Sequence, residues 1–153
     1  MALGSRRVPR WVDRTLKAVT HFGGTSATLL FCLALLAWPG TRGLGFAAIL
    51  ANALSHLIVQ LLKRSVVRPR PMELVPLAHH PDAFSFPSGH ACAASTMAVM
   101  LTVADPALGV PSVMVALLVG LSRVYLRVHY VTDVVVGQFI GAVTALLVSL
   151  ALP

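Results

Sequence analysis

Charged residues are scarce in this chain. They make up 11% of its 153 residues, whereas hydrophobic residues make up 57%, a balance far from that of a soluble domain. Most of the chain is therefore expected to lie in lipid. Acidic residues are the scarcest, because five of them face twelve Lys and Arg, for a formal net charge of +7. On so apolar a chain, this excess favours contact with anionic lipid headgroups or phosphate.

Two further features are lacking. Basic patches interleaved with aromatic residues do not occur, so nucleic acid is not an expected partner. Cysteine appears only at Cys32 and Cys92, without the CxxC spacing of a metal or redox site. Both cysteines are expected to be core residues.

Long apolar runs, by contrast, fill the chain. A membrane-spanning helix needs about 20 mostly apolar residues, and five stretches approach that length: 19–38, 43–62, 89–104, 107–124 and 131–152. The first and third are the shortest in uninterrupted apolar sequence. Before them, SRRVPRWVDRTLKAV places apolar and basic residues on opposite helical faces, which is typical of an interfacial helix over residues 1–18.

The predicted fold is therefore all-α: a polytopic membrane helical bundle of about five transmembrane helices plus the N-terminal interfacial helix. The whole chain, 1–153, is expected to form a single membrane-embedded domain. With five spans, the N-terminus, segment 63–88 and segment 124–130 share one side, which carries every Lys and Arg except Arg42. The positive-inside rule predicts that this side is cytoplasmic.

Polar and small residues recur every fourth position in two of these stretches. Asn52, His56 and Gln60 share one helical face, which should turn towards partners or a wet cavity because polar groups are costly against lipid. For His56, structural hydrogen bonding is favoured over catalysis. A second, small-residue ridge permits close helix contact, within one chain or in a homo-oligomer, and consists of Gly137, Gly141, Ala145 and Ser149.

Three polar clusters fall on the same predicted side: KRSVVRPRP (63–71), PSGH (87–90) and SRVYLRVHYVTD (122–133). Taken singly, they fit a headgroup anchor, a helix cap and an aspartate favoured by a helix dipole. Together they indicate a site for a phosphate-sized anion. Positive donors and the free N–H groups of a helix start would bind it, and the residues concerned are Lys63, Arg70, Ser88, Gly89 and Arg123.

Two histidines in these clusters indicate that the site catalyses phosphoryl transfer as well as binding an anion. His129 and Asp133 are four residues apart, so the carboxylate can hold the imidazole in one tautomer. His129 would attack phosphorus, and His90, from a different helix start, would protonate the departing alcohol. The basic residues would stabilise charge on the phosphoryl oxygens, so no metal is required. A zinc or magnesium site is the alternative, but Asp133 is the only carboxylate in the three clusters apart from Glu73, among many cations.

The clusters also resemble the signatures of a known family, the type 2 phosphatidic acid phosphatases, which share an active-site design with vanadium-dependent haloperoxidases. Those signatures are K-x6-R-P, P-S-G-H and S-R-x5-H-x3-D, and the chain matches all three within residues 43–150. The resemblance implies a helical bundle with a metal-free and cofactor-free phosphohistidine mechanism. It assigns His129 as nucleophile, Asp133 as its partner and His90 as acid and base, with phosphate bound by Lys63, Arg70, Ser88, Gly89 and Arg123.

The resemblance also bears on topology. Membrane members commonly have six spans, whereas five are predicted here, and many bacterial relatives face the exterior of the inner membrane. A multi-pass protein of the bacterial inner membrane is expected. Segment 63–88 would form the active-site loop, and its part 72–86 is interpreted as a lid or lip beside the site.

The expected function is an integral-membrane lipid phosphate phosphatase acting on a phosphomonoester or pyrophosphate. Candidate substrates are a polyprenyl-phosphoryl sugar phosphate, undecaprenyl pyrophosphate, phosphatidylglycerophosphate and phosphatidic acid, with polyprenyl carriers favoured over phosphatidic acid. Two other functions stay open. One is a non-enzymatic membrane protein that binds anionic lipids through the same charges. The other is a haloperoxidase-like oxidoreductase that holds vanadate.

Overall fold

The computed structural model describes residues 9–71 and 83–152. The helices are α1 Arg10–Val19, α2 Thr25–Ala37, α3 Arg42–Val66, α4 Gly89–Ala104, α5 Gly109–Tyr125 and α6 Val131–Ala151. Short 3-10 turns join some of them: η1 Thr20–Gly23, η2 Pro39–Thr41 and η3 Pro106–Leu108. In the described part of the chain, β pairing is limited to one isolated bridge, between Pro69 and Phe84. The all-α prediction is confirmed.

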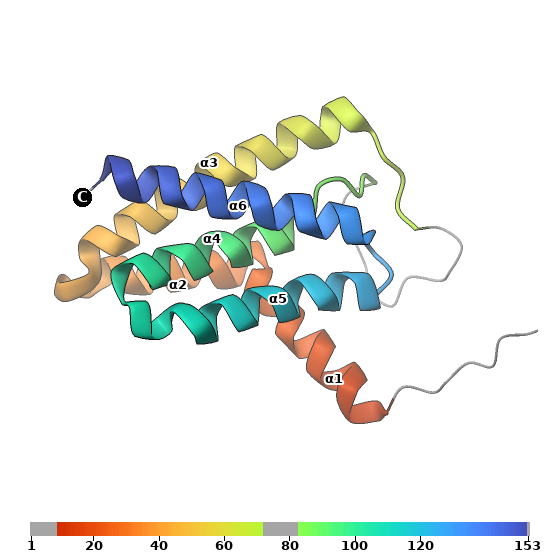
Figure 1. Ribbon diagram of the computed structural model, residues 1–153, viewed down its shortest axis with the longest axis horizontal. Coiled ribbons are helices and arrows are strands. Elements are labelled where there is room, and N and C mark those ends of the chain that lie inside the picture. The colour runs from red at the N-terminus through yellow and green to blue at the C-terminus, as the bar shows by residue number, and fades with distance from the viewer. Residues whose placement is uncertain (1–8, 72–82, 153) are drawn as a thin grey trace, which may run out of the picture.

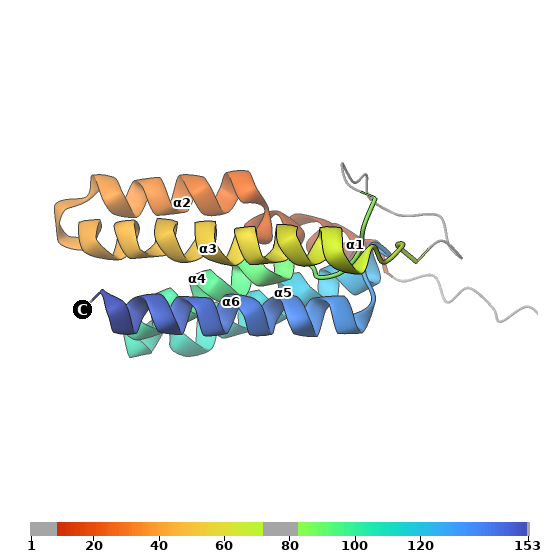
Figure 2. The same ribbon diagram turned by 90° about the horizontal axis from the view of Figure 1, so that it is seen from above.

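Helices α2 to α6 run along a common direction, and α1 projects from the bundle at an angle (Figure 1). Seen from above, α2 and α3 form one layer, and α4, α5 and α6 lie beneath it (Figure 2). Helix α4 is central, since it contacts α2, α3, α5 and α6. Its inward positions include Ala91, Ala94 and Ala98, all buried, and such short side chains let neighbouring helices approach closely.

The small-residue ridge of α6 is used inside the chain. A Cβ atom added to Gly137 would strike the backbone of Ser88, and one added to Gly141 would strike the carbonyl oxygen of Cys92. Ala145 is fully buried as well, whereas Ser149 is half-buried. The ridge from Gly137 to Ala145 is therefore an intramolecular contact with α4.

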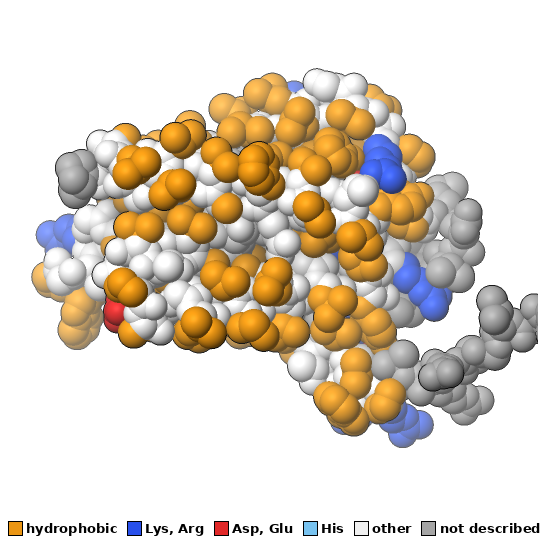
Figure 3. All heavy atoms as spheres, in the orientation of Figure 1, with side chains coloured by type: hydrophobic (Ala, Val, Ile, Leu, Met, Phe, Trp, Pro, Cys, Tyr) orange, Lys and Arg blue, Asp and Glu red, His pale blue; other side chains and the backbone are white. Residues whose placement is uncertain are grey.

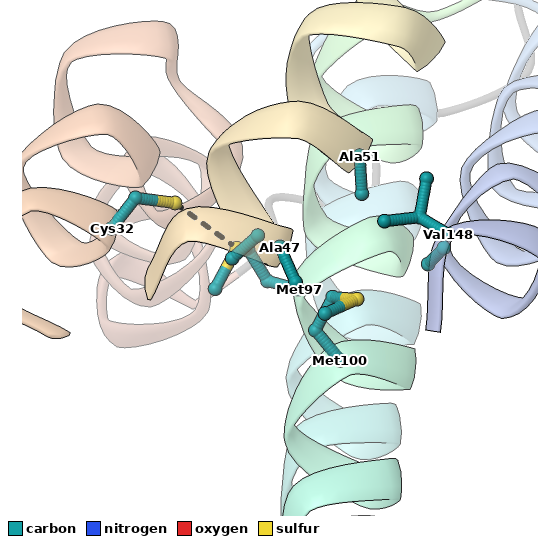
Figure 4. Packing of buried hydrophobic residues seen from close by; sticks show 8 residues of the cluster. Cys32, Ala47, Ala51, Met97, Met100 and Val148 are labelled. Atoms are coloured by element: carbon teal, nitrogen blue, oxygen red, sulfur yellow. Dashed lines mark hydrogen bonds between the residues drawn. The ribbon is translucent and has the colours of Figure 1, made fainter. Parts of the chain in front are cut away.

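The core draws residues from four helices (Figure 4). Cys32 of α2, Met97 and Met100 of α4, and Val148 of α6 pack together with small residues of α3, including Ala47 and Ala51. The Cys32 thiol lies 3.7 Å from the Met97 sulfur. Cys32 and Cys92 are both free and buried, which confirms that they are core residues.

Hydrophobic side chains are spread along the face of the bundle drawn in Figure 3, and the charged side chains visible there lie towards its ends. Leu30, Leu61, Phe139 and Leu147 each expose more than half of their side chain, and water would not favour so much apolar area. The chain is a multi-pass membrane protein. Three segments are long and apolar enough to cross a membrane alone: Pro39–Val66, Pro106–Tyr125 and Val131–Ala151.

The two remaining stretches are too short to cross a membrane alone: α4 has the predicted bounds 89–104, whereas α2 is shorter than the predicted stretch 19–38. Helix α2 has 13 residues and α4 has 16, so they measure about 20 and 24 Å against about 30 Å of bilayer core. The stretch 19–38 is not one helix, and that boundary prediction was wrong. The segments Arg10–Gly23 and Thr25–Ala37 meet at 56° and make a fourth span only if they cross together. The helices thus support three to four spans, and a fifth is not confirmed.

The bend has a local cause. Gly24 has extended backbone, with φ −72° and ψ 144°, which ends the preceding turn. Gly23 lies directly against the backbone carbonyl of His90, where a Cβ atom does not fit. Of the predicted interfacial helix 1–18, residues 1–8 lie outside the described part of the chain. The remainder forms α1, whose Leu16 is buried and whose Asp13 carboxylate accepts a hydrogen bond from the Tyr125 hydroxyl at 3.2 Å.

Candidate active site

The first two polar clusters are joined through Ser85. Beyond α3 the backbone turns at Val67, which has a left-handed φ of 47°, and runs past residues 84 and 85. The Ser85 N–H donates to the Arg68 carbonyl at 2.9 Å, and its hydroxyl donates to the Pro69 carbonyl at 3.0 Å. Ser85 is fully buried. Sequence reasoning missed this residue, because a serine in a loop gives no sign of its partners.

The second cluster is fixed to the third by Ser88. Its N–H donates to the Asp133 carbonyl at 2.9 Å, which places the start of α4 on the start of α6. The Ser88 hydroxyl oxygen accepts from the Ala91 N–H at 3.5 Å, so the side chain caps α4. The close approach of Gly137 to the Ser88 backbone completes this contact.

His129 lies in the loop before α6, with its two ring nitrogens in different surroundings. Its Nδ1 is 3.6 Å from Oδ2 of Asp133, and its Nε2 is 3.5 Å from an Arg70 guanidinium nitrogen. Asp133, in the first turn of α6, also accepts the Tyr130 N–H at 2.9 Å. Because the Asp133 side chain folds back over the start of α6 to cap it, its carboxylate reaches the His129 imidazole, although His129 itself lies outside the helix.

A further residue holds the other oxygen of this carboxylate. A guanidinium nitrogen of Arg68 lies 3.0 Å from Oδ1 of Asp133 and donates to the Thr132 hydroxyl at 2.8 Å. The Arg68 guanidinium also stacks 4.1 Å from the centre of the Tyr130 ring. Sequence reasoning missed Arg68 because it occupies one of the six unspecified positions of the K-x6-R-P signature, between Lys63 and Arg70. The only signal was its place in the repeated RPRP.

Burial sets the charge of His129. Loss of solvation lowers the pKa of His129 below its usual value, the hydrogen-bonding contact with Asp133 opposes this, and the nearby charges of Arg123 and Arg70 lower the pKa further. The net direction is downward. At neutral pH the imidazole is consequently uncharged and keeps a lone pair, as a nucleophile requires.

His129 faces a cavity of about 400 Å³. Five of the eight residues predicted for the site line it: Lys63, Arg70, Gly89, His90 and His129. They come from the end of α3, the following segment, the start of α4 and the loop before α6, which gather at one end of the bundle, opposite the C-terminus (Figures 1 and 2). Lys63 is almost fully buried, although lysine is rarely so without a charged or polar neighbour.

The other three predicted residues, Ser88, Arg123 and Asp133, are buried beside the cavity wall. Arg123 donates to the Thr20 hydroxyl at 2.8 Å, which ties α5 to η1 near the site. Among the described residues, no group of three His, Cys, Asp or Glu has the geometry of a metal site. Of the predicted lid 72–86, residues 72–82 lie outside the described part of the chain.

Comparison with known proteins identifies the family. A family model described as the PAP2 superfamily matches residues 44–153. The chain belongs to this superfamily. The PAP2 match contains all three polar clusters, and the resemblance drawn from them is confirmed.

Two relatives illustrate the PAP2 match in sequence. Phosphatidylglycerophosphatase B of Bacillus subtilis is 35% identical over 91% of this chain and 74% of that protein. Decaprenylphosphoryl-5-phosphoribose phosphatase of Mycolicibacterium smegmatis is 37% identical over 79% of this chain and 68% of that protein. The chain is a phosphatase.

The fold agrees with that of a solved PAP2 structure. It is the crystal structure of a transmembrane PAP2 type phosphatidylglycerolphosphate phosphatase from Bacillus subtilis, with a TM-score of 0.80 and 31% identity. The similarity covers 94% of this chain and 77% of that one. Because the family model begins at residue 44, the fold comparison extends the likeness to the N-terminal helices.

Proposed function

We propose that this chain is an integral-membrane lipid phosphate phosphatase that works through a metal-independent phosphohistidine intermediate. It hydrolyses a phosphomonoester or pyrophosphate on a polyprenyl or glycerolipid headgroup. The observation that carries the proposal is the placement of His129 on the cavity wall, between the Asp133 carboxylate and the Arg70 guanidinium. Lys63 and His90 line the same cavity.

In the first step, Nε2 of His129 attacks phosphorus while Nδ1 faces Asp133. The P–N bond forms as the P–O bond to the lipid alcohol breaks, and His90 gives its proton to the departing oxygen. The Asp133 carboxylate stabilises the positive charge that develops on the imidazole. The product of this step is a phosphohistidine and a neutral lipid alcohol, or a lipid phosphate when the substrate is a pyrophosphate.

In the second step, water attacks the phosphohistidine and His90 accepts its proton. The P–N bond breaks, inorganic phosphate leaves, and His129 and His90 return to their starting protonation states. Lys63 and Arg70 bind the phosphoryl oxygens, together with N–H groups at Gly89 and the α4 start capped by Ser88. Arg123, buried near His129, adds positive charge to the site.

The whole chain acts as one membrane domain, with segment 63–88 forming part of the site. Its place is the bacterial inner membrane, and the basic residues around the site favour the cytoplasmic face. Lipid substrates reach the cavity by lateral diffusion. Phosphatidylglycerophosphate and a polyprenyl-phosphoryl sugar phosphate are the leading candidates, supported by the names of the two relatives; undecaprenyl pyrophosphate and phosphatidic acid are the others.

Phosphate release by the purified protein in detergent, with EDTA present, tests the proposal across these four lipids. The wild type should release phosphate from at least one lipid, and His129→Ala and His90→Ala should lower the rate by at least about 10³-fold and 10²-fold. His21→Ala is the matched control, because His21 is exposed at the same end of the bundle and does not line the cavity.

Two results would contradict the proposal. Release that is indifferent to His129→Ala would mean that another group is the nucleophile. Binding of anionic lipid that survives His129→Ala, with no release from any lipid by the wild type, would instead indicate a lipid-binding protein.

A further inference from the structure

The cavity extends well beyond the residues that would bind phosphate. From Lys63 it follows α3 past Gln60, His56 and Ala53 to Ile49, with Leu29 and Cys32 of α2 on the facing wall. Lys63, Gln60 and His56 are spaced by three and four residues and so share one face of α3. At about 1.5 Å per residue, Gln60 lies about 4.5 Å and His56 about 10.5 Å from Lys63 along the helix axis.

His56 and Gln60 form a polar pair on the wall of this cavity, where His56 is exposed and Gln60 is half-buried. The Gln60 amide nitrogen is 3.1 Å from Nε2 of His56. After this contact the imidazole keeps a second nitrogen, and the amide keeps an oxygen and a second N–H, so the pair has further hydrogen-bonding capacity. Both residues belong to a segment long enough to span the membrane, where polar side chains are costly unless they face a polar environment.

Asn52, one turn further along α3, plays a different part. Its amide nitrogen donates to the Ala48 carbonyl at 3.0 Å and contacts the Met97 sulfur at 3.1 Å. It is therefore engaged in packing α3 against α4. Beyond it the wall is apolar, with Leu29 and Ile49. On α3, the polar groups of the cavity wall thus lie between the phosphate-binding end and Asn52. The facing wall adds Thr25 and Thr28 of α2, and the Thr28 hydroxyl already donates to the Gly24 carbonyl at 3.1 Å.

The proposed reaction predicts which part of the substrate lies beside His56 and Gln60. In an in-line displacement the leaving oxygen lies opposite the attacking nitrogen of His129, on the side of His90, which lines the cavity. The alcohol part of the substrate therefore extends from His90 into the cavity, where His56 and Gln60 are the polar groups that α3 presents between Lys63 and Asn52.

We infer that His56 and Gln60 bind the hydroxyl groups of a polyol that separates the scissile phosphate from the rest of the lipid. The inference rests on the proposed function and narrows its substrate class to polyol phosphate lipids, in which a glycerol or sugar phosphate is joined to the lipid through a second phosphate. A phosphate attached directly to a prenyl chain places hydrocarbon beside this pair, and one attached directly to a diacylglycerol offers only ester oxygens, which accept hydrogen bonds but cannot donate them. The pair therefore makes fewer hydrogen bonds with such a lipid than with a polyol.

A substrate comparison tests this assignment. Values of kcat/KM are measured for phosphatidylglycerophosphate and for phosphatidic acid with the same acyl chains, in the wild type and in His56→Leu and Gln60→Leu. The wild type should prefer the glycerol phosphate lipid. Each substitution should lower that preference by about tenfold, the effect of one good hydrogen bond, and change phosphatidic acid hydrolysis by less than about twofold.

Two controls separate a lost contact from a damaged fold. Leu57→Ala changes a neighbouring side chain that is exposed on the lipid side and should leave the preference unchanged. His56→Gln keeps hydrogen-bonding groups at the same position and should retain more of the preference than His56→Leu.

The outcomes distinguish this inference from the proposed function. Equal hydrolysis of both lipids, or a preference that survives both leucine substitutions, overturns the polyol subsite while release that depends on His129 still upholds the phosphatase. Release from neither lipid nor from any polyprenyl phosphate defeats the proposed function, and the subsite with it.

Discussion

At the scale of single residues, the orientation of His129, the proposed nucleophile, depends on Arg68, a side chain that the three motifs do not include. Lys63, Arg70, His90 and His129 could be found from sequence, because phosphate binding and proton transfer need those residue types at those positions. Arg68 could not, since its role arises only where α6 begins. There the Arg68 guanidinium contacts Oδ1 of Asp133, the carboxylate oxygen that does not face His129, and the face of the Tyr130 ring.

Arg68→Ala should therefore weaken catalysis and leave substrate binding almost intact. Without the guanidinium, the carboxylate and His129 lose their fixed orientation, and kcat should fall between about 10- and 100-fold. KM should change little, because Arg68 does not line the cavity. Steady-state kinetics of Arg68→Ala and Arg68→Lys measure both quantities, and the lysine, which keeps the charge but not the stacking, should restore part of kcat.

Arg64→Ala is the matched control, since Arg64 is exposed and close in the chain. If Arg68→Ala raised KM while kcat stayed at the wild-type value, Arg68 would be a substrate-binding residue and the positioning role would be wrong.

At the scale of elements, the contact between α4 and α6 sets the distance between the two histidine-bearing segments. The four-residue spacing of Gly137 and Gly141 predicted a close helix contact, but sequence alone did not say with which helix. The partner is α4, whose small residues let α6 approach so closely that Gly141 lies against the Cys92 carbonyl. This contact holds Ser88 against Asp133.

Gly141→Val should separate the two helices. The added side chain meets the Cys92 carbonyl and the Thr96 hydroxyl, and backbone atoms cannot move aside as a flexible side chain can. The overpacking should cost about 1–3 kcal/mol, seen as a lower thermal unfolding temperature in detergent and a reduced rate of phosphate release. Val135→Leu enlarges a lipid-exposed position of the same helix and should leave both unchanged. An unchanged unfolding temperature for Gly141→Val would show that α4 and α6 can pack together stably without a glycine at residue 141.

Helix positions were predictable where hydropathy alone decides them. Stretches 43–62, 107–124 and 131–152 all lie within or almost within observed helices. The prediction failed at Gly23 and Gly24, where tertiary contact overrides local pattern. The turn η1 crosses the start of α4 there, and only a residue without Cβ lets it lie against the His90 carbonyl.

At the scale of the whole molecule, the bundle brings segments from opposite ends of the chain to one site. Sequence predicted this gathering, because alternating spans place the three clusters on one side. It did not predict the short connections that assemble them. Ser85 joins the first cluster to the second, Ser88 joins the second to the third, and Thr20 holds Arg123. Each is a pairing between distant residues that no local pattern encodes.

The covalent intermediate tests the account most directly. Purified protein is mixed with a lipid phosphate radiolabelled in the scissile group, quenched within milliseconds in alkaline detergent, and digested to locate the label. If His129 is the nucleophile, an acid-labile, alkali-stable phosphoryl group should be found on His129 in the wild type and should be absent from His129→Ala. Turnover in which no label reaches His129, or labelling that His129→Ala does not diminish, would contradict it.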